Sequence, residues 1–119
     1  IRATVESVAY QTYDLFEAMK HDGLRPKLVK VDGGMVMNNW FSQFLSDVVN
    51  VGVLRPKVQE TTALGAAYMA GLQIGVYKSL KDISKNWSLD KKFSPKMKNK
   101  KKSNLLKGWS KAIKRTLIN

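Results

Sequence analysis

The first 78 residues alternate between two kinds of hydrophobic pattern, and this alternation limits the possible folds most strongly. Residues 3–21, 36–49 and 61–74 place apolar side chains at spacings of three and four, as one face of an α-helix does. Residues 27–32 and 51–54 are short apolar runs typical of strands. The order helix–strand–helix–strand–helix predicts an α/β fold whose parallel strands are joined by right-handed crossovers.

This pattern contains two strands, which is fewer than a parallel sheet normally has. Such sheets are usually wider and are covered by helices on both faces. The chain also starts at Ile1, without an initiator Met. We therefore expect a fragment of a larger domain, with the remaining strands of the sheet outside these 119 residues.

The chain changes character after residue 78. We expect a short helix over residues 79–86 and a lysine-rich loop over 87–103. A final amphipathic helix is predicted from a cap at Ser103 or Asn104 to about Leu117.

Positive charge is concentrated in this second part of the chain. Residues 91–119 hold 11 of the 21 Lys and Arg residues and none of the nine acidic ones. The other 10 basic residues nearly balance those acids, so the formal net charge of +12 belongs almost wholly to the tail. The chain thus divides into a nearly neutral part, residues 1–78, and a basic extension, residues 79–119.

The composition excludes several classes of catalytic chemistry. There is no cysteine, which excludes disulfides, thiolate zinc sites and cysteine nucleophiles. His21 is the single histidine, so a Ser-His-Asp triad or a histidine metal cluster has almost nothing to draw on. No apolar stretch approaches the ~20 residues that cross a bilayer.

A glycine pair between a strand and a helix is the main candidate site. Gly33 and Gly34 follow Val31-Asp32 and precede a helix expected from Val36. Glycines allow positive φ and leave no side chain between the backbone and a ligand. The N–H groups at the start of a helix favour phosphate.

Asn38 adds a second polar group to this candidate site. Its amide both donates and accepts hydrogen bonds, as the edge of an adenine requires. Taken alone, these residues favour a tight structural turn over a ligand site, with Asp32 as a strand-end cap instead of a metal ligand.

Six blocks of sequence carry a family resemblance that covers nearly the whole chain. They are residues 2–11 (RATVESVAYQ), 31–34 with Asn38 and Asn39, 43–47 (QFLSD), Arg55-Pro56, 60–71 (ETTALGAAYMAG) and 108–115 (GWSKAIKR). In this order they resemble the FGGY family of carbohydrate kinases. The first and last blocks resemble, more narrowly, the members that phosphorylate glycerol.

The resemblance implies a partial ribonuclease H-like domain of the actin-like ATPase superfamily. Such enzymes have two domains with the active site in the cleft between them. Residues 1–78 would be the second half of the C-terminal, nucleotide-binding domain, and residues 79–119 its C-terminal extension with a final helix.

The resemblance also implies roles for individual residues. Gly33 and Gly34 would form the adenosine-binding turn for ATP or ADP, with Gly34 contacting the nucleotide through its main chain and Asn38 directed towards the adenine. Gln43 and Asp47 would hold the turn and the following helix in place. Glu60 and the alanine-rich helix after it would pack behind the site.

No catalytic residue and no metal ligand are implied within the chain itself. The catalytic carboxylate, the phosphate-binding loop and the glycerol-binding residues of the family would all precede Ile1. The intact cytoplasmic enzyme would convert ATP and glycerol to ADP and sn-glycerol 3-phosphate, with Mg²⁺ held through the phosphates. Because phosphoryl transfer depends on a closed cleft, we expect the isolated chain to be inactive without its N-terminal part.

Three alternatives stay open at this stage. The lysine-rich run 98–102 and the uniform charge of the tail favour a module that binds nucleic acid or an anionic membrane, although no nucleic-acid-binding motif is present. The chain could also derive from another FGGY sugar kinase, or from a split gene. A homo-oligomer is compatible with each kinase interpretation.

Overall fold

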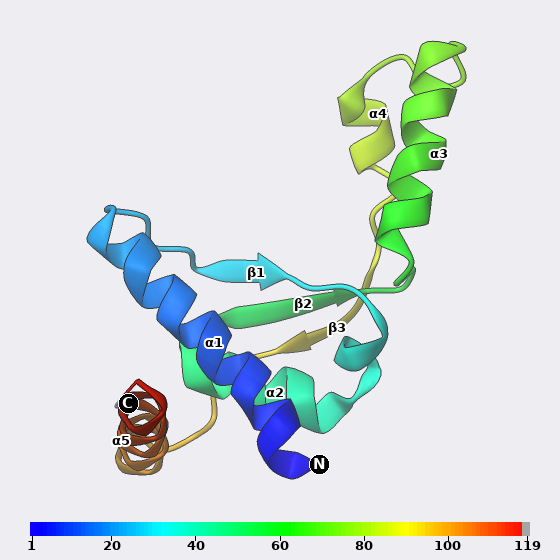
Figure 1. The fold of residues 1–119 in the computed structure, drawn as a ribbon. Coiled ribbons are helices and arrows are strands. Elements are labelled where there is room, and N and C mark those ends of the chain that lie inside the picture. Colours follow the sequence, from blue (N-terminus) through cyan, green and yellow to red (C-terminus); the bar gives the residue numbers. More distant parts are fainter. Residues whose placement is uncertain (118–119) are drawn as a thin grey trace.

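The computed structural model describes residues 1–117 (Figure 1). The elements in chain order are α1 (Arg2–His21), β1 (Leu28–Lys30), the 3₁₀-helix η1 (Gly34–Met37), α2 (Asn39–Val49), β2 (Gly52–Pro56), α3 (Thr61–Gln73), α4 (Leu80–Ser84), β3 (Leu89–Phe93) and α5 (Asn99–Thr116). The predicted helix–strand–helix–strand–helix order is confirmed for the first part of the chain. Within the described residues, no helix combines the length and apolar character of a membrane span.

A three-stranded sheet with the order β1-β2-β3 lies at the centre of the fold. β1 runs parallel to β2, as predicted, and Val29 lies opposite Val53. β3 runs antiparallel to β2, with Val53 opposite Phe93. Within residues 1–117, β1 pairs only with β2, so its other edge has no neighbour.

The loop predicted over residues 87–103 is wrong, because this stretch contains β3 and the first turn of α5. β3 has the sequence LDKKF, and only Phe93 is buried. Its lysines match the charged side chains common on edge strands, and they remove the apolar alternation by which a strand is recognised. The strand exists because β2 offers it a hydrogen-bonding partner.

The hydrophobic core lies between α1, α2 and the sheet. Val48 of α2 and Val53 of β2 are fully buried at its centre. The ring of Tyr10 on α1 meets Phe44 on α2 edge to face, with centroids 5.6 Å apart. The buried apolar residues of the core are Ala9, Tyr10, Phe16, Val36, Phe41, Phe44, Leu45, Val48, Val49, Val53 and Phe93.

The C-terminal extension is attached to this core and not to the end of the sheet alone. Trp109 of α5 stacks on Tyr10, with centroids 5.4 Å apart. α5 begins at Asn99, so the predicted caps at Ser103 and Asn104 are wrong. The backbone N–H groups of Lys96 and Met97, just before the helix, donate to Asp47 Oδ1, which anchors the helix start to α2.

α3 and α4 project away from the sheet (Figure 1). The molecule measures 54 × 32 × 32 Å and its radius of gyration is 17.4 Å. A compact chain of this length would have a radius of about 13.5 Å. Gly71 is the one buried residue of α3, packed so closely on Tyr77 that an added Cβ would lie 2.9 Å from its ring. The alanines of α3 are all exposed in this chain, namely Ala63, Ala66, Ala67 and Ala70.

Candidate functional site

The glycine turn begins where β1 ends, and its geometry requires glycine at the first position. Gly33 has φ +86° and ψ 170°, a region that side chains rarely adopt. Its N–H donates to Gln59 O at 3.3 Å, and its carbonyl accepts from Val36 N at 3.3 Å. The turn predicted at this position is therefore present, and its backbone direction is determined by Gly33.

Gly34 is a different case, because nothing inside the chain requires it to be glycine. Its φ is not positive, and an added Cβ would meet no atom within 4 Å. The same open space lies beside Gly33. The backbone of the turn is therefore accessible to a molecule from outside, which is the property expected of a ligand-binding turn.

Asn38 caps a helix in a way that the sequence pattern does not predict. We expected one helix from Val36, but a 3₁₀ turn ends at Met37 and α2 starts at Asn39. Asn38 Oδ1 accepts from Trp40 N at 2.9 Å and from Phe41 N at 3.3 Å. Two N–H groups at the N-terminus of α2 are thus already bound by Asn38, and η1 separates this helix from the glycine pair. The expectation that the helix starts directly after the glycines, where its N–H groups would favour a phosphate, is wrong.

The capping geometry leaves one half of the Asn38 amide for a ligand. The cap uses Oδ1, and within residues 1–117 the Nδ2 donor has no hydrogen-bond partner. Asn38 is exposed beside an open hollow of about 390 Å³, which Ile1, Arg2, Val5 and Trp40 also line. Gly34 and Asn38 lie at opposite ends of η1, about 8 Å apart at the rise of a 3₁₀-helix.

Arg55 is a buried residue of this site to which the sequence analysis assigned no role. It lies on β2, and its Nη1 donates to Val36 O at 2.9 Å, Met37 O at 3.1 Å and Asn39 Oδ1 at 3.2 Å. Its Nε donates to Asp90 Oδ2 on β3 at 2.7 Å. A charged residue inside an apolar strand is the signal that could have identified it, because buried charges are paired.

Asp32 links the glycine turn to α3. Its Oδ2 accepts a hydrogen bond from Thr61 Oγ1, in the first turn of that helix. Among residues 1–117, no three His, Cys, Asp or Glu side chains gather as a metal site would require. The hydrogen bond with Thr61 makes Asp32 a structural tie between the end of β1 and the start of α3.

Gln43 and Asp47 hold a different segment from the one expected. Gln43 Nε2 donates to Ser94 O at 2.8 Å and to Asp47 Oδ1 at 3.1 Å. Both side chains therefore fasten the connection between β3 and α5, and not the glycine turn. Glu60 is exposed at the start of α3 instead of packing behind the site.

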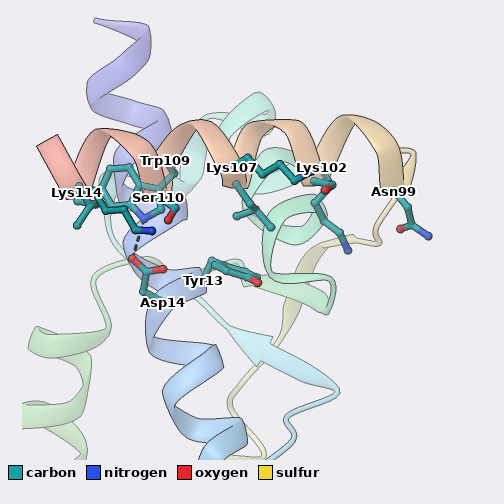
Figure 2. Close-up of a pocket in the computed structure, with 11 residues that line it drawn as sticks. Tyr13, Asp14, Asn99, Lys102, Lys107, Trp109, Ser110 and Lys114 are labelled. Atoms are coloured by element: carbon teal, nitrogen blue, oxygen red, sulfur yellow. Dashed lines mark hydrogen bonds between the residues drawn. The ribbon is translucent and has the colours of Figure 1, made fainter.

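A second concave region lies between α1 and α5, with an open volume of about 750 Å³ (Figure 2). Figure 2 shows Trp109 reaching from α5 towards α1, where its Nε1 donates to Asp14 Oδ2 at 2.7 Å. Tyr13 also lines this groove, and Lys102, Lys107 and Lys114 add positive charge to it. The tryptophan contact ties the two helices together.

The tyrosines of α1 are held in their neutral form. Burial, with the neighbouring Glu6 carboxylate, raises the pKa of Tyr10 to about 12. Burial and the nearby Glu17 also raise the pKa of Tyr13. The raised pKa values extend the pH range in which both hydroxyls stay protonated further into the alkaline region.

Comparison with known proteins supplies a family context for this geometry. The sequence model of the C-terminal domain of the FGGY family of carbohydrate kinases matches residues 1–74. A glycerol kinase of Thermoanaerobacter pseudethanolicus is 54% identical over 118 residues, which are 98% of this chain and 24% of that protein. A glycerol kinase of Thermoanaerobacter sp. strain X514 is 52% identical over the same shares.

Solved structures with a similar fold include kinases for other substrates. The crystal structure of Plasmodium falciparum glycerol kinase with ADP superposes with a TM-score of 0.80 at 36% identity, over 99% of this chain and 24% of that one. A xylulose kinase of Lactobacillus acidophilus superposes with a TM-score of 0.71 at 22% identity, over 90% of this chain and 21% of that one, which is a likeness of fold alone. The chain spans about a quarter of the length of the curated relatives that it matches.

Proposed function

The chain belongs to the FGGY family of carbohydrate kinases, and we propose that it is the nucleotide-binding part of an ATP-dependent glycerol kinase. In this proposal, residues 1–78 are the second half of the C-terminal domain and residues 79–119 are its basic extension. The remaining strands of the sheet, which would pair with the free edge of β1, belong to the part of the enzyme that precedes Ile1.

One observation carries the proposal, namely the structural likeness to a glycerol kinase that was crystallised with ADP. That likeness extends over 99% of this chain. The glycine turn supports the same conclusion, because the backbone at Gly34 is open to an external molecule and the Nδ2 donor of Asn38 is available. These groups suit a nucleotide base and sugar better than they suit a phosphate, since the N-terminus of α2 is already capped.

The residues would act by holding the nucleotide in place. The main chain of Gly33 and Gly34 would lie along the adenosine, while Asn38 would donate from Nδ2 to the adenine. ATP supplies the γ-phosphoryl group, which a hydroxyl of glycerol attacks as ADP leaves, with Mg²⁺ held through the phosphates. Holding the nucleotide in the reactive orientation contributes to the rate, although no group of this chain exchanges a proton or a bond.

Nucleotide binding by the chain is the first property to test. The experiment is an amide-resolved NMR titration of the 119-residue chain with ADP at moderate salt, with inorganic triphosphate as the control ligand. We expect saturable shifts at Gly33, Gly34 and Asn38 with ADP but not with triphosphate. Equal shifts with both ligands, or shifts confined to the lysines of α5, would contradict the proposal.

Kinase activity needs a second experiment with a complete active site. The matching quarter of the Thermoanaerobacter pseudethanolicus glycerol kinase would be replaced by this chain. We expect the chimera to phosphorylate glycerol with ATP, and Asn38→Asp in the chimera to raise KM for ATP while KM for glycerol stays unchanged. A folded chimera in which Asn38→Asp changes both constants equally would contradict a role confined to the nucleotide.

The exposed lysines of α5 support a second candidate function, the binding of a polyanion. Lys100, Lys107, Lys111 and Lys114 recur at helical spacing and are exposed, with no acidic residue after Asp90. The test is binding of a short DNA duplex over a range of salt concentrations. Steep loss of affinity with salt, removed by Lys107→Gln with Lys111→Gln, would favour this function.

A further inference from the structure

We infer that Arg55 is a positioning residue for the nucleotide turn, and that Asp90 of the extension holds Arg55 in place. This inference rests on the proposed function, because it assigns a role around the same turn. Within residues 1–117, the hydrogen bonds of Arg55 go to Val36, Met37, Asn39 and Asp90, and not to Gly34 or Asn38. Arg55 acts through the carbonyl groups between Gly34 and Asn38.

The turn needs an outside donor because a 3₁₀-helix ends with unpaired carbonyl groups. The carbonyl of Met35 accepts from Asn38 N at 3.2 Å, whereas the carbonyls after it have no acceptor role inside this short helix. Arg55 Nη1 donates to the carbonyls of both Val36 and Met37, and Ser42 Oγ is a second donor to Val36 O at 2.8 Å. Hydrogen bonds from a charged donor are about twice as strong as neutral ones.

The position of Arg55 suits this task. Its side chain is only 8% exposed, and it reaches from the central strand β2 to the break between η1 and α2. The same Nη1 also donates to Asn39 Oδ1, in the first residue of α2. One guanidinium therefore holds both sides of the break at Asn38, which sets the angle between the glycine turn and the helix.

Asp90 completes the arrangement from the C-terminal extension. Its Oδ2 accepts from Arg55 Nε at 2.7 Å, while the carboxylate is still 40% exposed. The planar guanidinium uses separate nitrogens for the carboxylate and for the turn, which a lysine ammonium cannot do. A strand that follows the family-matched residues thus contributes to the geometry of the nucleotide turn.

The experiment compares four variants of the full chain with the unaltered protein. Arg55→Met removes all of the contacts, Arg55→Lys keeps the charge, and Asp90→Asn weakens only the supporting pair. The matched control is Ser46→Ala, which removes a buried hydroxyl that donates to Val51 O and Phe93 O, away from the turn. The two readouts are amide exchange over residues 36–42 without ligand, and the Kd for ADP.

We expect Arg55→Met to speed amide exchange over residues 36–42 and to weaken ADP binding about tenfold. Arg55→Lys should resemble Arg55→Met, and Asp90→Asn should fall between it and the unaltered chain. Ser46→Ala should lower the melting temperature and leave the Kd for ADP unchanged. The Lys variant keeps the test decisive if the Met variant does not fold.

Two outcomes would overturn the inference. One is unchanged exchange and unchanged ADP affinity in Arg55→Met and Arg55→Lys. The other is an equal loss of ADP affinity in Ser46→Ala, which would assign the effect to overall stability. If the unaltered chain binds no ADP, the proposed function fails, and the exchange data without ligand still decide whether Arg55 positions the turn.

Discussion

Gly33 and Gly34 are neighbours with separate physical requirements, and substitution can separate them. Gly33→Ala places a side chain at φ +86°, which we expect to lower the free energy of unfolding by about 1–3 kcal/mol. Gly34→Ala meets open space, so stability should stay within about 0.5 kcal/mol while ADP binding weakens. Urea unfolding and ADP titration of both variants provide the measurements. A stable Gly33→Ala variant would refute the backbone argument.

The amide of Asn38 has two separate roles, because Oδ1 caps α2 and Nδ2 is the proposed donor to the nucleotide. Asn38→Asp keeps the oxygen that caps α2 and removes the Nδ2 donor, so we expect normal stability and weaker ADP binding. Asn38→Ala removes the cap as well and should cost about 1 kcal/mol of folding free energy. Thermal melts with ADP titrations distinguish these effects. Equal ADP affinity in Asn38→Asp and the unaltered chain would remove Asn38 from the proposed site.

Tyr10 makes stability depend on pH in the alkaline range. Its pKa is raised from 10.0 to about 12 in the folded chain, chiefly by burial and next by Glu6. The unfolded chain therefore loses this proton first, and stability should fall as pH rises from about 10 to about 12. Melting temperatures of the unaltered chain and of Tyr10→Phe measure the difference. A parallel decline in both proteins would show that other groups cause the loss.

For single residues, the sequence indicates which positions are unusual more readily than it indicates which other residues they contact. The glycine pair is recognisable because a turn after a strand is a local feature. Arg55 is different, since its role depends on carbonyls that lie 18 and 19 positions away along the chain. The partners of Gln43 and Asp47 could not be predicted for the same reason, as they lie about 50 positions later.

Trp109 is the residue of α5 that stacks on an aromatic ring of the core, beside the apolar contacts of Leu105 and Leu106. Trp109 stacks on Tyr10 and donates to Asp14. We expect Trp109→Ala to lower the free energy of unfolding by about 2–3 kcal/mol, through lost apolar burial and a lost hydrogen bond. Hydrogen exchange along α5 should increase more than along α2. Uniform exchange in both helices would indicate that α5 folds only together with the whole core.

Elements that are amphipathic by themselves were predictable, and those that depend on a neighbour were not. α1, α2 and α3 follow from the spacing of their apolar residues, and their observed ends lie close to the predicted ones except at the start of α2. β3 exposes four of its five residues and exists through its pairing with β2. The start of α5 at Asn99 depends on Asp47, which accepts a hydrogen bond from Lys96 N just before the helix. Asp47 lies far from this helix in the sequence, so no local pattern indicates its role.

The whole molecule exposes surfaces that a complete domain would cover. β1 has a free edge within residues 1–117. Met69 of α3 is 52% exposed, and Ile74, directly after α3, is 77% exposed. We expect the isolated chain to associate with itself as its concentration rises. Sedimentation velocity should give a mass above the 13.4 kDa of the monomer, and Met69→Lys should reduce it. A monomer at all concentrations would contradict the idea that partners are missing from these surfaces.

The shape of the molecule could be predicted only in part. The alternating pattern correctly indicates the parallel pair of strands β1 and β2. The expectation that all remaining strands of the sheet lie outside the chain is wrong, because β3 of the C-terminal extension pairs with β2. The pattern does not indicate that α3 stands away from the sheet. Small side chains such as Ala66 and Ala70 are compatible with close packing on a neighbour, but they are equally compatible with the exposed position observed here.

The pairing of Pro56 with Leu89 brings the end of β2 next to the start of β3. Lys57 N donates to Ser88 O at 3.0 Å directly beyond that pair, so the two ends of the projecting part meet. In topological terms, β2 and β3 form a β-hairpin, and α3 and α4 are an insertion in the loop that connects its two strands. Because both ends of that loop leave the sheet at the same point, its helices can be tilted, exchanged or shortened without breaking a strand pair.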